Sequence, residues 1–206
     1  PVDVVALSDI SQIGAGWYHT CAAVKNDEVY CWGYNATGQL GNETAISAKA
    51  PEKVVNLPCG GGGTSKTCDG CTPTTCAKAG KTSGLIADGC NGTLWCGNPG
   101  EKLVGSTYFG CVIAKDGKVM CWGRNNLGQL GNGTTTDSNT AVPVGSLTNV
   151  TAISAHNWHN LALKSDGTVV GWGRNGHGEA NVPEGLNHVT TIAAGSLFNL
   201  AIKADG

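Results

Sequence analysis

The amino-acid sequence predicts an all-β protein built from repeated, four-stranded β-propeller blades, and three observations support this fold class. A hairpin-like segment that ends in Trp-Gly recurs along the chain. Glycine accounts for 32 of the 206 residues without the every-third-residue period of collagen. The long Leu-, Ala-, Glu- and Lys-rich stretches that favour helices are missing. This pattern is typical of many short strands joined by tight turns.

The recurring segment is an apolar run, a short polar turn and a second apolar run that ends in Trp-Gly. Three complete copies and one copy that stops at its turn align: residues 19–33, 109–123, 159–173 and 198–206. Asp-Gly pairs occupy the turn of the second and third copies, where glycine adopts a positive φ at little cost. An apolar stretch precedes each copy, and a Gly-rich turn with a Pro-Val-type strand follows the first two. Each unit therefore provides about four strands, as in one propeller blade.

The spacing of the copies divides the chain. Trp32 and Trp122 are 90 residues apart, whereas Trp122 and Trp172 are 50 apart, and natural blades run to roughly 40–50 residues. The first interval therefore holds an insert. The expected units are repeats at 1–58, 99–148 and 149–187, a cysteine-rich insert at 59–98, and a partial repeat at 188–206. Turn spacing alone would also allow a sandwich or a solenoid of hairpins.

Several motifs resemble RCC1 repeats of the bacterial type. They are residues 16–24 (GWYHTCAAV), 31–41 (CWGYNATGQLG) and 121–131 (CWGRNNLGQLG). Residues 178–183 (GEANVP) resemble a shorter bacterial variant of the repeat. The resemblance implies a propeller, and that family usually closes a ring of seven blades. Because this chain supplies about three and a half, we expect an incomplete part of such a ring. It is a fragment, a visible portion of something longer, or a unit that another copy completes through open sheet edges, and we favour a fragment.

Four cysteines occupy matching places in the first two hairpins. Cys21 and Cys31 lie on the two arms of the first, and Cys111 and Cys121 on the two arms of the second. The third copy has Leu161 and Gly171 at these places, so the pair is present or absent together. Opposed residues of neighbouring strands are within disulfide reach. We therefore expect two cross-strand disulfides, the alternative being four buried free thiols.

The insert contributes the other six cysteines, which we expect to form disulfides of unknown pairing: Cys59, Cys68, Cys71, Cys76, Cys90 and Cys96. A zinc site is the first alternative, but the insert contains no histidine and no second Cys-x-x-Cys. A redox site is the second, but the βαβ context it needs is absent. Residues 59–64 (CGGGGT), 71–77 (CTPTTCA) and 88–97 (DGCNGTLWCG) resemble cysteine modules of secreted myxobacterial proteins. With ten cysteines in all, we expect a secreted bacterial protein, extracellular or at the cell surface.

Composition and motifs exclude several function classes. The formal net charge is −2 and the 13 Lys and Arg residues form no run, which argues against nucleic-acid binding. No apolar stretch is long enough for membrane insertion. Hydrolase, metalloprotease, phosphate-binding and dinucleotide-binding motifs are absent. His19 and His159 share one repeat position and are interpreted as structural. We expect no enzymatic activity, no cofactor and no metal site.

The loop before each hairpin is the candidate binding surface, because equivalent loops of a propeller gather on one face. One loop position carries Tyr18, Tyr108, Trp158 and Leu197, and the position before it carries Trp17, Thr107, Asn157 and Ser196. Aromatic side chains there would offer contact area at low entropy cost, as in interface hot spots. The alternative is that the recurring aromatic packs between blades. The variation at the other position favours exposure.

These features predict a binding or adhesion module that holds a protein or glycan partner. Two other functions remain open. The RCC1-like propellers include a secreted bacterial β-lactamase inhibitor, so enzyme inhibition is one alternative. The dense cysteines and the unclosed ring suggest a structural subunit of a surface filament as the other.

Overall fold

The computed structural model describes residues 7–24, 28–57, 85–87, 93–95, 103–114 and 117–204. These residues form five antiparallel sheets, and the sequence prediction of an all-β fold is confirmed. None of the described segments forms an apolar helix with the length needed to traverse a bilayer.

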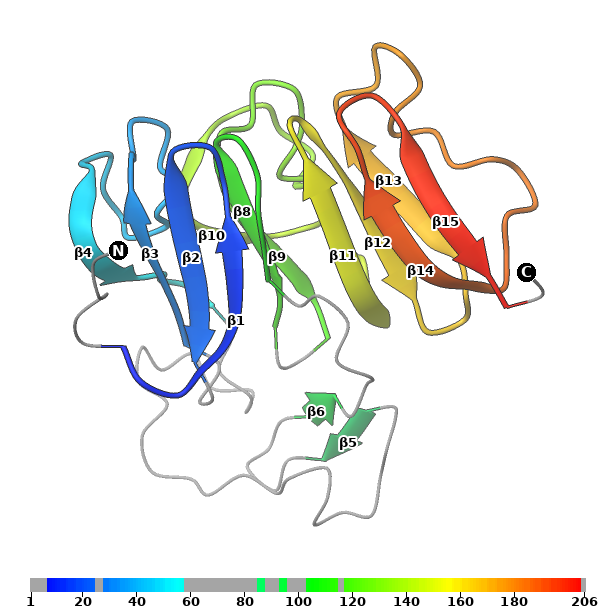
Figure 1. Ribbon diagram of the computed structural model, residues 1–206, viewed down its shortest axis with the longest axis horizontal. Coiled ribbons are helices and arrows are strands. Elements are labelled where there is room, and N and C mark those ends of the chain that lie inside the picture. Colours follow the sequence, from blue (N-terminus) through cyan, green and yellow to red (C-terminus); the bar gives the residue numbers. More distant parts are fainter. Residues whose placement is uncertain are drawn as a thin grey trace.

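Four of the sheets follow one another along the chain (Figure 1). The first sheet contains β1 (Ile10–Ala15), β2 (His19–Val24), β3 (Val29–Gly33) and β4 (Ala48–Lys53). The second contains β7 (Leu103–Gly105), β8 (Phe109–Ile113), β9 (Val119–Gly123) and β10 (Ser138–Pro143). The third contains β11 (Val150–His156), β12 (His159–Lys164) and β13 (Val169–Gly173), and the fourth β14 (Val189–Ala194) and β15 (Asn199–Lys203). A two-stranded sheet within the predicted insert pairs β5 (Leu85–Ala87) with β6 (Thr93–Trp95).

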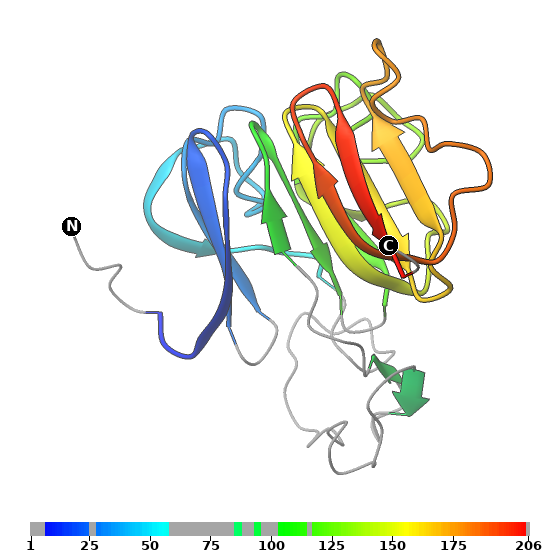
Figure 2. The same cartoon turned by 45° about the vertical axis from the view of Figure 1, so that its right-hand side comes forward.

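The first strand of each main sheet contacts the first strand of the neighbouring sheet. The first strands meet in succession, β1 with β7, β7 with β11 and β11 with β14. Figure 2 shows the same succession of sheets after a 45° turn, from blue at the N-terminal end to red at the C-terminal end. This arrangement of twisted sheets around their first strands is the architecture of propeller blades.

Apolar cores fill the spaces between consecutive sheets. The first core joins Cys21, Cys31 and Leu40 from the first unit to Leu103, Met120 and Trp122 of the second. The second core joins Phe109, Cys121 and Leu130 from the second unit to Val150, Ile153 and Ala162 of the third. Because each sheet is covered by the next one, burial of this apolar surface stabilises the stack as well as each sheet.

Tryptophan side chains also connect consecutive sheets by hydrogen bonds. The indole Nε1 of Trp122 donates to the carbonyl oxygen of Gln39 at 3.0 Å, and that of Trp172 donates to the carbonyl oxygen of Gln129 at 3.0 Å. In both cases the acceptor lies in the Gly-rich turn of the preceding unit. The packing of each sheet against the preceding one therefore explains why the tryptophan of the Trp-Gly motif recurs.

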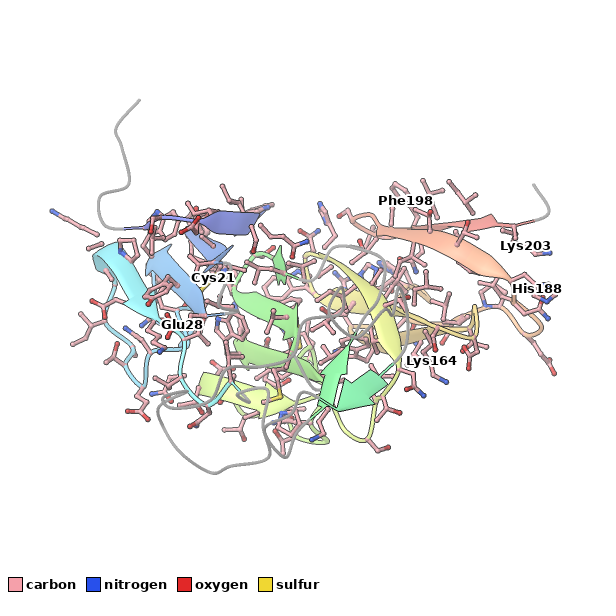
Figure 3. The ribbon with its side chains drawn as sticks, turned by 90° about the horizontal axis from the view of Figure 1, so that it is seen from below. Cys21, Glu28, Lys164, His188, Phe198 and Lys203 are labelled. Atoms are coloured by element: carbon pink, nitrogen blue, oxygen red, sulfur yellow. A yellow bond between two sulfur atoms is a disulfide. The ribbon has the colours of Figure 1, made fainter. Side chains whose placement is uncertain are left out.

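The two predicted cross-strand disulfides are confirmed. Cys21 pairs with Cys31 and Cys111 with Cys121, each at a Cα–Cα distance of 4.1 Å and each directly opposed in the strand register. Figure 3 labels Cys21, which lies on β2, an inner strand of the first sheet. The six predicted disulfide cysteines of the insert lie outside the described residues.

The expectation of about four strands per unit holds for the first two sheets but is wrong for the third, which has three. Between β9 and β11 the chain has residues 124–149 for a turn and an outer strand, whereas between β13 and β14 it has only residues 174–188. The shorter connection accommodates the turn but leaves no room for a fourth strand.

The fourth sheet leaves apolar side chains uncovered. Phe198, Leu200 and Ile202 of this unit are about 60% exposed, at positions where the earlier units bury Phe109, Cys111 and Ile113. Figure 3 labels Phe198 at the start of β15 and Lys203 at its end. No further sheet covers this face among the described residues.

Candidate functional site

The loops that precede the second strand of each main sheet lie at one end of the sheets, the upper end in Figure 1. The loops that follow Trp-Gly leave from the same end. The β5–β6 hairpin lies at the opposite end (Figure 1). The sequence prediction that equivalent loops share a face therefore agrees with the structure, and the candidate site is built from both sets of loops.

Aromatic side chains from three sheets form a continuous line on this face. The ring of Tyr18 stacks on that of Tyr108, with centroids 5.6 Å apart and planes inclined by 29°. Tyr108 in turn contacts Trp158, again at 5.6 Å. Trp17 and Tyr34 approach Tyr18 edge-to-face at 6.3 and 6.0 Å. We refer to these five residues as the aromatic row.

The glycine of each Trp-Gly pair sets the backbone of the row. Gly123 has a φ of +107°, and a Cβ there would lie 2.5 Å from the carbonyl oxygen of Tyr108. Only glycine fits so close to that carbonyl, which accepts a 2.9 Å hydrogen bond from the N–H of Arg124. Gly33 and Gly173 have the same conformation and make room for the same bond in their units.

The row is partly exposed, which supports both interpretations of the recurring aromatic. Trp17 is 68% exposed and Tyr18 53%, whereas Tyr108 and Trp158 are half-buried by their neighbours in adjacent sheets. The rings therefore pack against one another between neighbouring sheets and remain partly exposed to solvent. Leu197 occupies the equivalent position of the fourth unit, where it is 48% exposed.

The other predicted loop position behaves differently, and its expected exposure is wrong for Thr107. Thr107 is buried, and its hydroxyl donates to Asn157 Oδ1 at 3.3 Å. The Asn157 amide donates in turn to the Ser196 hydroxyl at 2.6 Å. These polar side chains link three consecutive sheets. The residue type at this position differs between units because each side chain must form a hydrogen bond with the one in the next unit. Trp17 and Ser196 are the members of this position that are exposed to solvent.

Sequence reasoning missed Arg124. Its guanidinium carbon lies 5.3 Å from the ring centroid of Tyr108 and 5.0 Å from that of Trp158, which are cation–π distances. The available signal was its place directly after Trp-Gly, where Tyr34 and Arg174 stand in the neighbouring units. This position lies just outside the hairpin repeat, which ends at Trp-Gly.

No metal-binding arrangement of side chains is found in the part of the chain that the structure describes. No group of three or more His, Cys, Asp or Glu side chains is placed to hold a metal there. A hollow of about 300 Å³ near the first strands is lined by residues such as Gln12, Leu103 and Ala155, none of them ionisable.

The two histidines interpreted as structural are buried in the strands. Burial lowers the pKa of His19 to about 4, and a contact with the backbone of Phe109 opposes this shift only in part. His159 shares a 2.8 Å hydrogen bond with Asn199 of the next sheet. Both positions contribute to packing beneath the row.

Comparison with known families identifies the repeat. Two family models described as "Regulator of chromosome condensation (RCC1) repeat" match the chain. One matches residues 10–39 and 150–179, and the other residues 26–64 and 116–163. Together they cover more than half of the chain, and the matched ranges include Tyr18 and Trp158 of the row but not Tyr108.

Individual relatives and solved structures agree. Probable E3 ubiquitin-protein ligase HERC6 of Homo sapiens is 30% identical over 64% of this chain and 15% of that protein. Protein pim1 of Schizosaccharomyces pombe is 25% identical over 78% of this chain and 26% of that protein. The crystal structure of Prp20p from Saccharomyces cerevisiae has a TM-score of 0.63 at 21% identity, covering 96% of this chain and 43% of that one. This chain thus spans less than half the length of each.

Proposed function

Because this chain belongs to the RCC1 repeat family of β-propellers, we propose that it is a binding module that holds a protein partner on the aromatic row. The observation that carries the proposal is the line of five contacting, partly exposed aromatic side chains drawn from three sheets. Tyr and Trp held in this way offer large contact areas with little entropy left to lose.

A protein partner fits the row better than a glycan. Sugars bind by stacking on open aromatic faces, whereas the stacked rings of Tyr18 and Tyr108 each cover one face of the other. Solved relatives also support a protein partner, since yeast RCC1 (Prp20) was crystallised bound to Kap60, and Prp20p has binding properties to Gsp1p and histones. Catalysis is not part of the proposal, because the matched region is only 15% of the probable ligase HERC6.

The proposed location is extracellular or at the cell surface. The Cys21–Cys31 and Cys111–Cys121 disulfides support it, because such bonds persist in oxidising compartments and are rare in reducing ones. Intact mass before and after reduction tests this for protein isolated from its native source. A mass that does not change on reduction would contradict it.

The test of the binding function starts from a phage-displayed library of random peptides, selected on the immobilised 206-residue protein with its disulfides intact. Selected peptides are titrated against the wild type, Tyr108→Ser and the matched control Tyr30→Ser. Tyr30 lies on β3, where its hydroxyl is 2.9 Å from Glu28 Oε2. We expect affinity to fall by about tenfold or more for Tyr108→Ser and to change less than about twofold for the control.

Trp17→Ser is the second variant, because its largely exposed side chain contacts the row only through the ring of Tyr18. Recovery of no peptides, or of peptides insensitive to both variants of the row, would overturn the proposal. If the protein bound to a glycan array through the row, the partner would be a glycan instead of a protein. β-Lactamase inhibition is assayed with the same proteins, and its absence at micromolar concentration removes the inhibitor alternative.

Self-association is a second candidate property, favoured by the uncovered apolar face of the fourth sheet. Leu200 and Ile202 are about 60% exposed there, and apolar sheet faces of this kind promote pairing with another chain. Analytical ultracentrifugation of the wild type and Leu200→Lys tests this. Association that depends on concentration only in the wild type supports it, and two equally monomeric proteins contradict it.

A further inference from the structure

The cation at the centre of the aromatic row is fixed in place by its own backbone and by two rings. The N–H of Arg124 donates to the carbonyl of Tyr108, and its guanidinium lies over both Tyr108 and Trp158. Its Nε donates to Asn126 Oδ1 at 3.0 Å. A guanidinium carries five N–H donors, and Nε–H is the one that donates to a side chain among the described residues.

Arg174 occupies the equivalent position of the third unit but has a counterion. Its N–H donates to the carbonyl of Trp158, just as Arg124 donates to Tyr108. Its Nε lies 3.2 Å from Oε1 of Glu179, whose side chain is only 1% exposed. The charge of Arg174 is thus neutralised within the protein.

The residue that makes this difference lies in the turn after Trp-Gly. Glu179 Oε2 accepts a hydrogen bond from the N–H of His177, two residues earlier. In the second unit Gln129 Oε1 accepts the same bond from the N–H of Leu127. Glutamine therefore fulfils the structural role of this position without a charge, and it leaves Arg124 with no carboxylate within ion-pair distance in the described structure.

A half-buried guanidinium between aromatic rings favours a carboxylate as its partner. The rings displace water, which strengthens an ion pair relative to one in bulk solvent. The planar fork of arginine also matches a carboxylate with two hydrogen bonds. A polyanion is a poorer fit, because the chain is slightly acidic overall and nucleic-acid sites need clustered basic side chains.

We infer that the partner of the aromatic row is an acidic peptide segment, with an Asp or Glu carboxylate paired to Arg124 and apolar side chains against Tyr18 and Tyr108. The inference rests on the proposed binding function and specifies its ligand. Arg124 is the residue that determines specificity, and the row supplies contact area around it.

The test uses a synthetic peptide from the selection described above, chosen for sensitivity to Tyr108→Ser. We expect the selected peptides to be enriched in Asp and Glu, and Arg124→Gln to weaken binding about tenfold or more, as for a charged pair within an interface. Replacing the acidic residue of the peptide by its amide should cause a similar loss. The two changes combined should weaken binding little more than either alone.

The matched control is the double variant Arg174→Gln, Glu179→Gln, which removes the neutralised pair and copies the glutamine of the second unit. Its peptide affinity should stay within about twofold of the wild type. The inference is wrong if Arg124→Gln binds equally well or if the selected peptides lack carboxylates, while sensitivity to Tyr108→Ser would leave the binding function standing. Tighter binding of inorganic polyphosphate than of the peptide would also overturn it.

Discussion

The second and third sheets share one framework and differ in two pairs of residues. In both, the tryptophan of Trp-Gly donates to a carbonyl of the preceding unit at 3.0 Å. In both, an asparagine side chain accepts the N–H five residues later, with Asn125 bonded to Leu130 at 2.9 Å and Asn175 to Ala180 at 3.0 Å. These positions are determined by backbone geometry and therefore recur.

The first difference is the disulfide. The third sheet has Leu161 and Gly171 where the second has Cys111 and Cys121, at the same register. A Cβ at Gly171 would lie 2.4 Å from the carbonyl oxygen of Ala180. The shorter loop after β13 therefore brings the backbone into the space that the second cysteine would need. Both cysteines are absent from the third sheet because there is no space for a side chain at the position of one of them.

The second difference is the charge at the candidate site, where Arg174 is paired with Glu179 and Arg124 is not. Together the two differences show which repeat positions are fixed. Residues whose side chains form hydrogen bonds with the backbone are the same in both units. Residues that face a neighbouring loop or sheet differ between the units, and they differ in matched pairs.

The largest expected effect separates the two tryptophans. Trp122 is completely buried, whereas Trp172 is half-buried. Trp122→Ala should lower the free energy of unfolding by about 3–5 kcal/mol, as expected for a large buried aromatic, and Trp172→Ala by clearly less. Urea denaturation followed by circular dichroism measures both. Equal losses would show that the two sheets are equally well packed.

Removal of the disulfide should have the next largest effect. The Cys111–Cys121 bond joins residues ten apart in sequence, so loss of this constraint on the unfolded chain should cost about 2–3 kcal/mol. The double variant Cys111→Ala, Cys121→Ala is compared with the wild type by denaturation without a reductant. If the difference remained after both proteins were reduced, packing and not the cross-link would explain it.

The converse substitution tests why the third sheet lacks the bond. Leu161→Cys with Gly171→Cys restores both thiols at an opposed register, but the Gly171 side must displace the Ala180 carbonyl. We expect about 1–3 kcal/mol of destabilisation from overpacking, measured as a shift of the urea midpoint under reducing conditions. A variant as stable as the wild type would contradict the steric explanation.

The smallest expected effect compares the two arginines. Arg174→Gln leaves buried Glu179 unpaired and should cost about 1–2 kcal/mol, less than for a fully buried pair because Arg174 is 34% exposed. Arg124→Gln breaks the cation–π contacts and the exposed hydrogen bond to Asn126, and it should cost about 0.5–1 kcal/mol. A larger loss for Arg124→Gln would mean that this cation serves the fold.

The dependence of stability on pH should reveal the contribution of the Arg174–Glu179 ion pair. Burial raises the pKa of Glu179, but hydrogen bonds from its own N–H and that of His177, with the Arg174 charge, leave the pKa lowered. Since its folded pKa lies below the unfolded value, the pair stabilises above that value, and this contribution is lost as the pH falls through the folded pKa. The free energy of unfolding of Glu179→Gln should lack this pH-dependent contribution when denaturation curves are measured between pH 6 and pH 3.

The sequence by itself determined the all-β repeat, the two hairpin disulfides and the recurring aromatic of the loop face. All three follow from residues that recur in register, because each repeat must satisfy the same backbone and cover the same neighbour. Tyr108 and Cys111 were found in this way, and the RCC1 resemblance rested on the same residues.

Only the tertiary structure decided what depends on contacts between repeats. The sequence could not show that Thr107 is buried against Asn157, that Ala180 occupies the space beside Gly171, or that Arg124 lies over the aromatic row without a counterion. Each depends on how far one loop reaches toward the next sheet, and residues distant in the chain set that reach. Repeat alignment compares equivalent positions, whereas the candidate site is formed by positions that are not equivalent.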